Sequence, residues 1–280
     1  MATMDERTAA ILTTIRDLEP FSQRVRLRSP RGISDREYRG VHFIDYARAA
    51  GLIGKNTQGG GLGDHYFVVT AADGVSVVVA FAEVAPRFTD KRVMLAFEQD
   101  GEPLNVGVRL IVPGDDLGGR SIMGVADVTI ATAGSAPAGE HSAGPVSIGG
   151  LVAQPYTLEA GDVTDADLIE VTTQPTPRAG GSVVPSRTYR GVPLWSLLER
   201  AEPVMDPAVN EDFINKAIVA RSNDGYATVI AGGEIEPRFM NAAVVLVPEE
   251  DGSFRLVVPY DKLIGRNAKS ITSIELVAPA

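Results

Sequence analysis

A glycine followed by two cations is the arrangement in this sequence best suited to holding a ligand. Gly265-Arg266-x-x-Lys269 places a guanidinium and an ammonium beside a flexible backbone. Both groups form charge-assisted hydrogen bonds with anions. The segment therefore predicts an anion site, and the alternative is a solvated basic turn before the last strand. An earlier segment, Gly119-Arg120, has Met123 in place of the lysine, which favours the later segment as the site.

A carboxylate and a guanidinium recur together in Glu83-x-x-Pro86-Arg87-Phe88 and Glu234-x-x-Pro237-Arg238-Phe239. The two charges could form a bidentate pair or line the mouth of a pocket, and a paired structural role is the favoured interpretation. Tyr226 follows an Asp-Gly turn where the earlier copy has Val75. It is a candidate to face a ligand, although an aromatic side chain at a strand start more commonly packs.

Several other kinds of site are excluded or lack their pattern. The sequence has no cysteine, which excludes disulfides, zinc–thiolate sites, iron–sulfur clusters and a thiol nucleophile. Its three histidines, His42, His65 and His141, do not have the spacing of metal ligands. There is no Gly-x-Ser-x-Gly nucleophile elbow, and the glycines of 59–63 are not followed by Gly-Lys-Ser/Thr. The sequence therefore shows no recognisable set of catalytic residues.

The elements that must position these residues show helical and strand periodicity in turn. Apolar residues with helical spacing predict helices over 4–18, 43–50 and 194–201. Asp73-Gly74 and Asp224-Gly225 each join two β-branched runs and predict hairpins. Further apolar runs predict strands over 24–28, 93–97, 108–112, 125–130, 146–152, 168–172, 243–247, 254–258 and 273–277. Mostly strands with one short helix near the start of each unit indicate an α+β fold.

A series of short motifs occurs twice in the same order. The residue numbers of matching motifs differ by one constant amount in the first part of the series and by another in the last part. A short insertion within 102–108 accounts for the change of offset. The pattern predicts a tandem duplication, with residues 131–145, rich in Ala, Gly, Ser and Pro, as the linker. It predicts one domain over 1–130 and another over 146–280, able to pack as an internal pseudo-dimer. The paired motifs are Tyr38-Arg39-Gly40-Val41 with Tyr189-Arg190-Gly191-Val192, and Arg109-Leu110-Ile111-Val112-Pro113 with Arg255-Leu256-Val257-Val258-Pro259.

Composition limits the class of partner. The chain has 280 residues, 44% hydrophobic and 22% charged, with a formal charge of −10. Such a composition is that of a globular protein, and the negative charge argues against a nucleic-acid or anionic-membrane partner. No run of apolar residues is long enough to span a bilayer. The N-terminus lacks the pattern of a signal peptide, so we expect a cytoplasmic protein, or a periplasmic one if a signal was removed before residue 1.

The ordered motifs of the later copy resemble the molybdopterin-binding domain of sulfite-oxidase-type oxidoreductases. They run from Tyr189-Arg190-Gly191-Val192-Pro193-Leu194 through Asp224-Gly225-Tyr226 and Arg255-Leu256-Val257-Val258-Pro259 to Gly265-Arg266-Asn267-Ala268-Lys269. The resemblance implies a mixed α+β fold, made of two tandem β-rich domains of this type, with a pterin pocket. It also implies that Gly265, Arg266 and Lys269 hold the phosphate end of molybdopterin, with Arg190 and Tyr226 as further candidate cofactor-binding residues.

This family holds its metal with a cysteine thiolate, and this sequence departs from that pattern. The matching regions, 170–175 and 26–30, contain no cysteine, and hydroxyl or amide groups are poorer ligands for a soft metal centre. We therefore expect a protein that binds a small anionic ligand, or molybdopterin, without thiolate-ligated redox catalysis. The alternatives are a molybdopterin-dependent oxidoreductase, a cofactor-free enzyme using the same pocket, and a scaffold that binds nothing.

Overall fold

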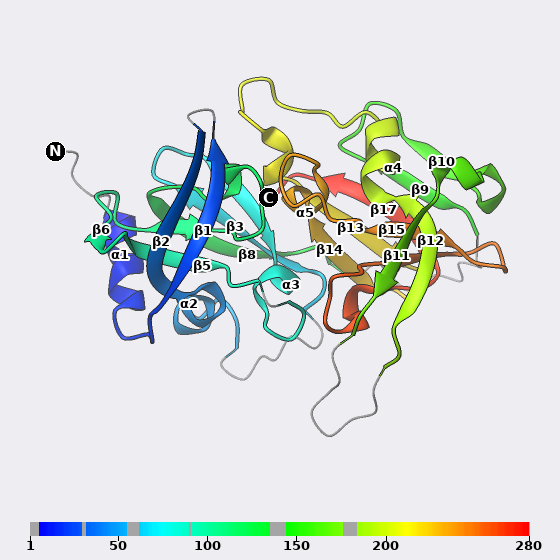
Figure 1. The fold of residues 1–280 in the computed structure, drawn as a ribbon. Coiled ribbons are helices and arrows are strands. Elements are labelled where there is room, and N and C mark those ends of the chain that lie inside the picture. The colour runs from blue at the N-terminus through cyan, green and yellow to red at the C-terminus, as the bar shows by residue number, and fades with distance from the viewer. Residues whose placement is uncertain are drawn as a thin grey trace.

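The computed structural model describes residues 6–29, 32–54, 62–89, 91–134, 144–175 and 184–279. We refer to residues 6–134 as the N-terminal half and to residues 144–279 as the C-terminal half. In Figure 1 the N-terminal half is coloured blue to green and lies on the left, and the C-terminal half lies on the right. Among the described residues, no helix is long and apolar enough to cross a membrane.

The N-terminal half contains two antiparallel sheets. The larger has the order β1-β2-β5-β6, with β7 beside β5, and the smaller has the order β4-β3-β8. The strands of the larger sheet are β1 (Phe21–Ser29), β2 (Gly32–His42), β5 (Met94–Gln99), β6 (Glu102–Pro103) and β7 (Arg109–Ile111). Those of the smaller are β3 (His65–Ala71), β4 (Ser76–Ala80) and β8 (Val125–Thr132). The predicted Asp73-Gly74 turn joins β3 to β4, and Gly74 takes the positive φ of 90° that such a turn favours.

The C-terminal half also contains two sheets, in the orders β10-β9-β17-β13-β14 and β11-β12-β15-β16. All neighbouring strands are antiparallel except β9 and β17, which run parallel. The first sheet comprises β9 (Val146–Gly150), β10 (Tyr156–Leu158), β13 (Ala217–Ser222), β14 (Ala227–Ala231) and β17 (Ile271–Val277). The second comprises β11 (Ile169–Thr173), β12 (Arg187–Pro193), β15 (Val245–Pro248) and β16 (Phe254–Val257).

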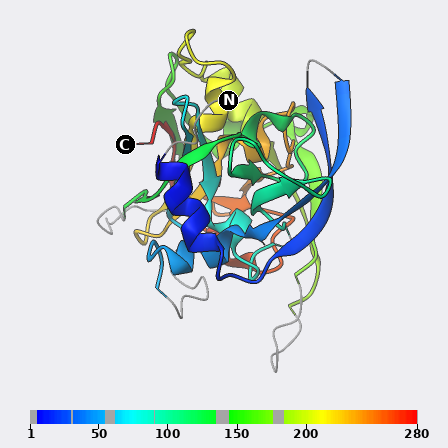
Figure 2. The same ribbon diagram turned by 90° about the vertical axis from the view of Figure 1, so that its left-hand side faces the viewer.

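The helices are short. They are α1 (Glu6–Ile15), α2 (Phe43–Ala49), α3 (Phe81–Val84), α4 (Leu194–Arg200) and α5 (Gly232–Ile235). The described residues also form five 3₁₀ turns: η1 (Gly118–Arg120), η2 (Ala160–Asp162), η3 (Asp165–Asp167), η4 (Asp212–Asn215) and η5 (Ile264–Arg266). The sequence predicted α1, α2 and α4 close to these bounds. Helix α1 lies on the side of the N-terminal half that faces away from the C-terminal half (Figures 1 and 2).

The predicted α+β fold of the sulfite-oxidase type is wrong. Strands make up 41% and helical segments 19% of the structure, and the four sheets form a mainly β, β-propeller-like ring. An α+β fold requires helices that cover a sheet as a layer of their own. The helices found here are too short to do so, because α3 and α5 are single turns at strand ends.

The predicted tandem repeat is not supported either. The sheets of the N-terminal half have five and three strands, whereas those of the C-terminal half have five and four. Strands β9 and β10 belong to the C-terminal five-stranded sheet, and among the described residues the three-stranded sheet of the N-terminal half has no strands in their place. The short motifs recur in the sequence, but the strand sets that surround them differ.

Two hydrophobic cores, one in each half, meet through a third cluster. That cluster joins Tyr66 and Val78 of the smaller N-terminal sheet to alanines and valines of β13 and β14. In addition, Ile214 and Phe239 of the C-terminal half pack into the core of the N-terminal half. The predicted linker 131–145 lies partly outside the described residues, and the division into domains at 130 and 146 stays a prediction.

Candidate functional site

Arg266 is buried at the centre of a set of ion pairs in the C-terminal half. It ends η5, and its side chain has no exposure to solvent. Its Nε and one terminal nitrogen donate to Asp261 at 2.9 and 2.7 Å. The other terminal nitrogen donates to the two oxygens of Glu234 at 3.1 and 3.0 Å. Two carboxylates thus neutralise Arg266 and engage all three of its nitrogens.

Arg120 has the same surroundings in the N-terminal half. It ends η1, is fully buried, and donates to Asp115 at 2.7 and 2.6 Å. It also donates to both oxygens of Glu83 at 3.0 and 2.9 Å. A second cation is present here, because Lys91 Nζ donates to Glu83 at 2.5 Å. Each half therefore holds one buried arginine between two carboxylates.

The second cation makes Glu83 more acidic than Glu234. Burial opposes the charged form of Glu83, but Arg120 and Lys91 outweigh it and lower its pKa to about 2. Burial raises the pKa of Glu234; Arg266 opposes that rise, and the negative charge of Glu83 adds to it. Instead of a lysine, Glu234 has the hydroxyl of Tyr260, which donates to it at 2.6 Å. Glu234 directly follows Gly233, whose Cβ position lies 2.4 Å from Cδ of Arg120, so the two sets of ion pairs lie together as one buried polar centre.

Glycines allow the two halves to approach each other around this centre. A Cβ on Gly233 would lie 2.4 Å from Cδ of Arg120, which comes from the other half. A Cβ on Gly265 would lie 2.7 Å from the ring of Phe88, again across the two halves. The backbone amide of Asp116 also donates to the carbonyl of Phe239 at 3.1 Å. Gly265 is therefore required for packing, whether or not it touches a ligand.

The structure brings together only some of the predicted cofactor-binding residues. The Tyr226 hydroxyl donates to the carbonyl of Gly265 at 2.6 Å, beside the buried Arg266. Lys269 is exposed and, among the described residues, shares no hydrogen bond or ion pair with them. Arg190 is exposed and pairs with Asp165 at 3.1 Å. The expected pair of exposed cations is not found, because Arg266 lies in the interior; ligand binding by these residues stays a prediction.

The glutamate and arginine of Glu-x-x-Pro-Arg-Phe do not pair with each other. Glu234 binds Arg266, whereas Arg238 Nε donates to Glu236 at 2.7 Å. Glu234 also accepts from the backbone amide of Ala231 at 2.8 Å, which caps α5. Only the glutamate of the motif belongs to the buried polar centre, so the predicted pairing of its two charges is not found.

The residues present do not fit the cofactor that the resemblance implied. Arg266, expected to hold its phosphate end, has its donors engaged by Asp261 and Glu234. The sequence offers no thiolate, and no group of three or more His, Asp or Glu side chains in the described part could hold a metal ion. His42 stacks on Phe21, His65 pairs with Asp64, and His141 lies outside the described residues.

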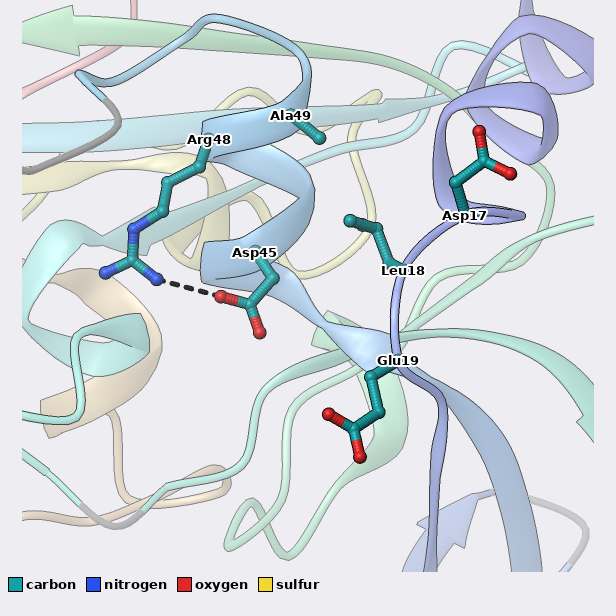
Figure 3. Close-up of a pocket in the computed structure, with 6 residues that line it drawn as sticks. All are labelled: Asp17, Leu18, Glu19, Asp45, Arg48 and Ala49. Atoms are coloured by element: carbon teal, nitrogen blue, oxygen red, sulfur yellow. Dashed lines mark hydrogen bonds and ion pairs between the residues drawn. The ribbon is translucent and has the colours of Figure 1, made fainter.

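Three surface cavities lined by described residues are candidate sites. The first, of about 450 Å³, lies between α2 and the segment that follows α1. In Figure 3, Asp17, Leu18 and Glu19 come from that segment and Asp45, Arg48 and Ala49 come from α2. Its only cationic lining residue, Arg48, already donates to Asp45 at 2.8 Å. This cavity offers an acidic wall without a group that would select a ligand.

The second cavity, of about 330 Å³, lies at the open face of the β1–β2 hairpin. Its lining residues are Arg26, Arg28, Ile33, Asp115 and Asp116. The third, of about 410 Å³, lies beside α4 and is lined by apolar side chains and carboxylates. Neither of these two cavities was predicted from the sequence. The available signal for the second was the alternation of Arg24, Arg26 and Arg28, which places three guanidinium groups on one exposed face.

Comparison with known proteins gives little further information. No protein-family model matches the chain, and no curated protein matches it. Among solved structures, the sulfane dehydrogenase SoxCD from Paracoccus pantotrophus matches with a TM-score of 0.38 and 19% sequence identity. The match covers 51% of this chain and 41% of the SoxCD chain, so it spans less than half of the length of that protein. A likeness this distant leaves the predicted family membership unshown.

Proposed function

We propose that this protein binds a small oxyanion, or the oxyanion group of a small ligand, between Arg26 and Arg28. The observation that carries the proposal is the cavity of about 330 Å³ that Arg26 and Arg28 both line. Arginine suits this role, because its planar fork of donors matches the oxygens of carboxylate, sulfate or phosphate. A small anion is the class of ligand predicted from the sequence, but this site lies in the N-terminal half.

The strand itself positions the two arginines. Leu27 between them is buried, so the alternation of β1 directs Arg26 and Arg28 to the same exposed face. Leu27 packs into a cluster on the inner face of the same sheet, and this packing holds the strand in place. The arginine pair thus lies on a strand whose opposite face is anchored in a hydrophobic cluster.

The two aspartates that line the cavity do not cancel this positive charge. The buried Asp115 is engaged by Arg120 through two hydrogen bonds. Asp116 pairs with Arg28 at 3.4 Å, but both side chains are more than half exposed. An exposed pair of this kind is worth little and yields readily to a ligand. Arg26 contributes the second cation, and Ile33, which is 53% exposed, provides an apolar wall.

Anion titration with matched variants tests the proposal. Sulfate and phosphate are titrated at constant ionic strength by isothermal calorimetry against the unmodified protein, R26Q/R28Q and R24Q/R36Q. The control pair removes the same charge from the same hairpin, but Arg24 and Arg36 pair with Asp35 and Asp100 and do not line the cavity. We expect at least tenfold weaker binding only in R26Q/R28Q.

Two results would overturn this assignment. Equal loss in both double variants would mean that general surface charge, and no defined site, binds the anion. Loss of binding in Lys269→Ala would mean that the anion binds at the segment predicted from the sequence, beside Lys269.

The oxidoreductase alternative has a separate test. Stoichiometric molybdenum with a pterin absorption spectrum in purified protein would contradict a cofactor-independent binding protein.

A further inference from the structure

We propose that the cavity beside α4 is a second binding site, which takes a small organic ammonium ion with an apolar body. Its volume is about 410 Å³, and it lies between Trp195 of α4, the segment 203–213 and the segment 236–238. The proposal is independent of the oxyanion site, which lies in the other half of the chain and has the opposite charge preference.

Glu236 lines this cavity, and one of its two carboxylate oxygens lacks a donor among the described residues. Glu236 is only 4% exposed, and one of its oxygens accepts from Arg238 Nε at 2.7 Å. Its other oxygen, Oε2, is buried and has no hydrogen-bond partner among the described residues. Buried polar atoms are nearly always paired, and an unpaired carboxylate oxygen is costly. A donor supplied by a ligand would satisfy it.

The charges around Glu236 favour a cation as that donor. Glu211 is a second carboxylate on the cavity wall. Arg238 is the only cation among the lining residues, and it already pairs with both Glu211 and Glu236. Burial raises the pKa of Glu211; Arg238 opposes the rise, and the charge of Glu236 adds to it. A third carboxylate, Asp212, is paired with Lys216 at 2.7 Å and adds little net charge. A bound ammonium ion would balance the remaining negative charge.

The position of Glu211 depends on the N-terminal half. Glu211 adopts a left-handed backbone conformation, with φ of 56°, which is uncommon for a residue other than glycine. Its Oε2 lies only 2.2 Å from the position that a Cβ on Gly119 would occupy, so a side chain at residue 119 would clash with it. A glycine of the N-terminal half thus leaves space for the second carboxylate.

Apolar side chains provide the rest of the wall. Trp195, Met205 and Val209 line the cavity, and Val209 is 41% exposed. The Trp195 ring is held edge-to-face against Phe213, at 5.1 Å between ring centres and 80° between planes. An indole face attracts organic cations, and methionine adapts to irregular apolar groups. An ammonium group on an aromatic or aliphatic body fits this combination.

Phenethylamine is the probe, and 2-phenylethanol and 3-phenylpropionate are its neutral and anionic counterparts. Trp195 is the only tryptophan, so its fluorescence reports occupancy directly, and calorimetry gives the affinity. We expect phenethylamine to bind at least tenfold more tightly than 2-phenylethanol, and 3-phenylpropionate not to bind at this cavity. E236Q keeps an oxygen for Arg238 and should weaken phenethylamine binding at least tenfold.

E199Q is the matched control, because Glu199 lies on the same helix, is exposed and does not line the cavity. Its affinity for phenethylamine should equal that of the unmodified protein. Equal affinity for phenethylamine and 2-phenylethanol would overturn the proposal, and so would an unchanged affinity in E236Q. The comparison of the three probes uses the unmodified protein, so the test stands even if E236Q fails to fold. Sulfate binding should be unchanged in E236Q, which separates this site from the oxyanion site.

Discussion

At the scale of single residues, Arg266 shows how far a local pattern can be interpreted. Its spacing from Lys269 is that of an exposed cationic turn, and nothing nearby in the sequence reveals that it is buried. Its partner Glu234 belongs to a distant turn, α5, and only the fold brings the two together. The Glu-x-x-Pro-Arg-Phe motif carried the available signal, since Glu83 and Glu234 bind buried arginines in the same way.

Replacing Arg266 distinguishes a structural residue from a ligand-binding one. Arg266→Met leaves Asp261 and Glu234 buried without their cation, which costs about 3–5 kcal/mol of unfolding free energy in comparable cases. Lys269→Met removes the exposed cation of the same segment and should change stability by no more than about 0.5 kcal/mol. Urea denaturation measures both. Similar stabilities for the two variants would show that Arg266 is not held as the structure describes.

At the scale of elements, the sequence predicted most strands and the longer helices, but not how the strands pair. Hairpins such as β3–β4 could be predicted, because Asp-Gly turns and β-branched runs are local signals. The parallel pairing of β9 with β17 joins the start of the C-terminal half to its end, and no local pattern encodes it. The α+β prediction failed at this level, since short helices were counted as a layer that they do not form.

The glycine of Tyr-Arg-Gly-Val has an element-level role that can be tested. Gly40 lies at a bulge between β2 and β5, where a Cβ would be 2.1 Å from the carbonyl oxygen of Leu95. Gly40→Ala should therefore push the strands apart and cost about 1–3 kcal/mol or more. Gly149, in β9, has open space around its Cβ position, so Gly149→Ala should be neutral or slightly stabilising. Thermal unfolding of the two variants checks this, and equal melting temperatures would contradict the close approach.

At the scale of the whole molecule, the two halves share their most buried contacts. Arg120 of the N-terminal half packs on Gly233, and Phe88 packs on Gly265. Phe239 of the C-terminal half lies within the core of the N-terminal half. Buried charges of this kind lose their surroundings if either half unfolds alone, because each set is enclosed partly by the other half. The structure therefore implies that the halves unfold together.

Gly233→Ala tests this coupling. The added methyl group would overlap Cδ and Nε of Arg120, both 2.4 Å from its ideal position, and should cost about 1–3 kcal/mol. Trp195 fluorescence follows the C-terminal half, whereas far-UV circular dichroism follows both, and we expect the two transitions to coincide and to shift together. Gly161→Ala, at an exposed position with open space, is the control and should leave both unchanged. The contrary result would be a shifted fluorescence transition with part of the dichroism transition unshifted. The halves would then unfold independently, and the buried polar centre would not join them into one cooperative unit.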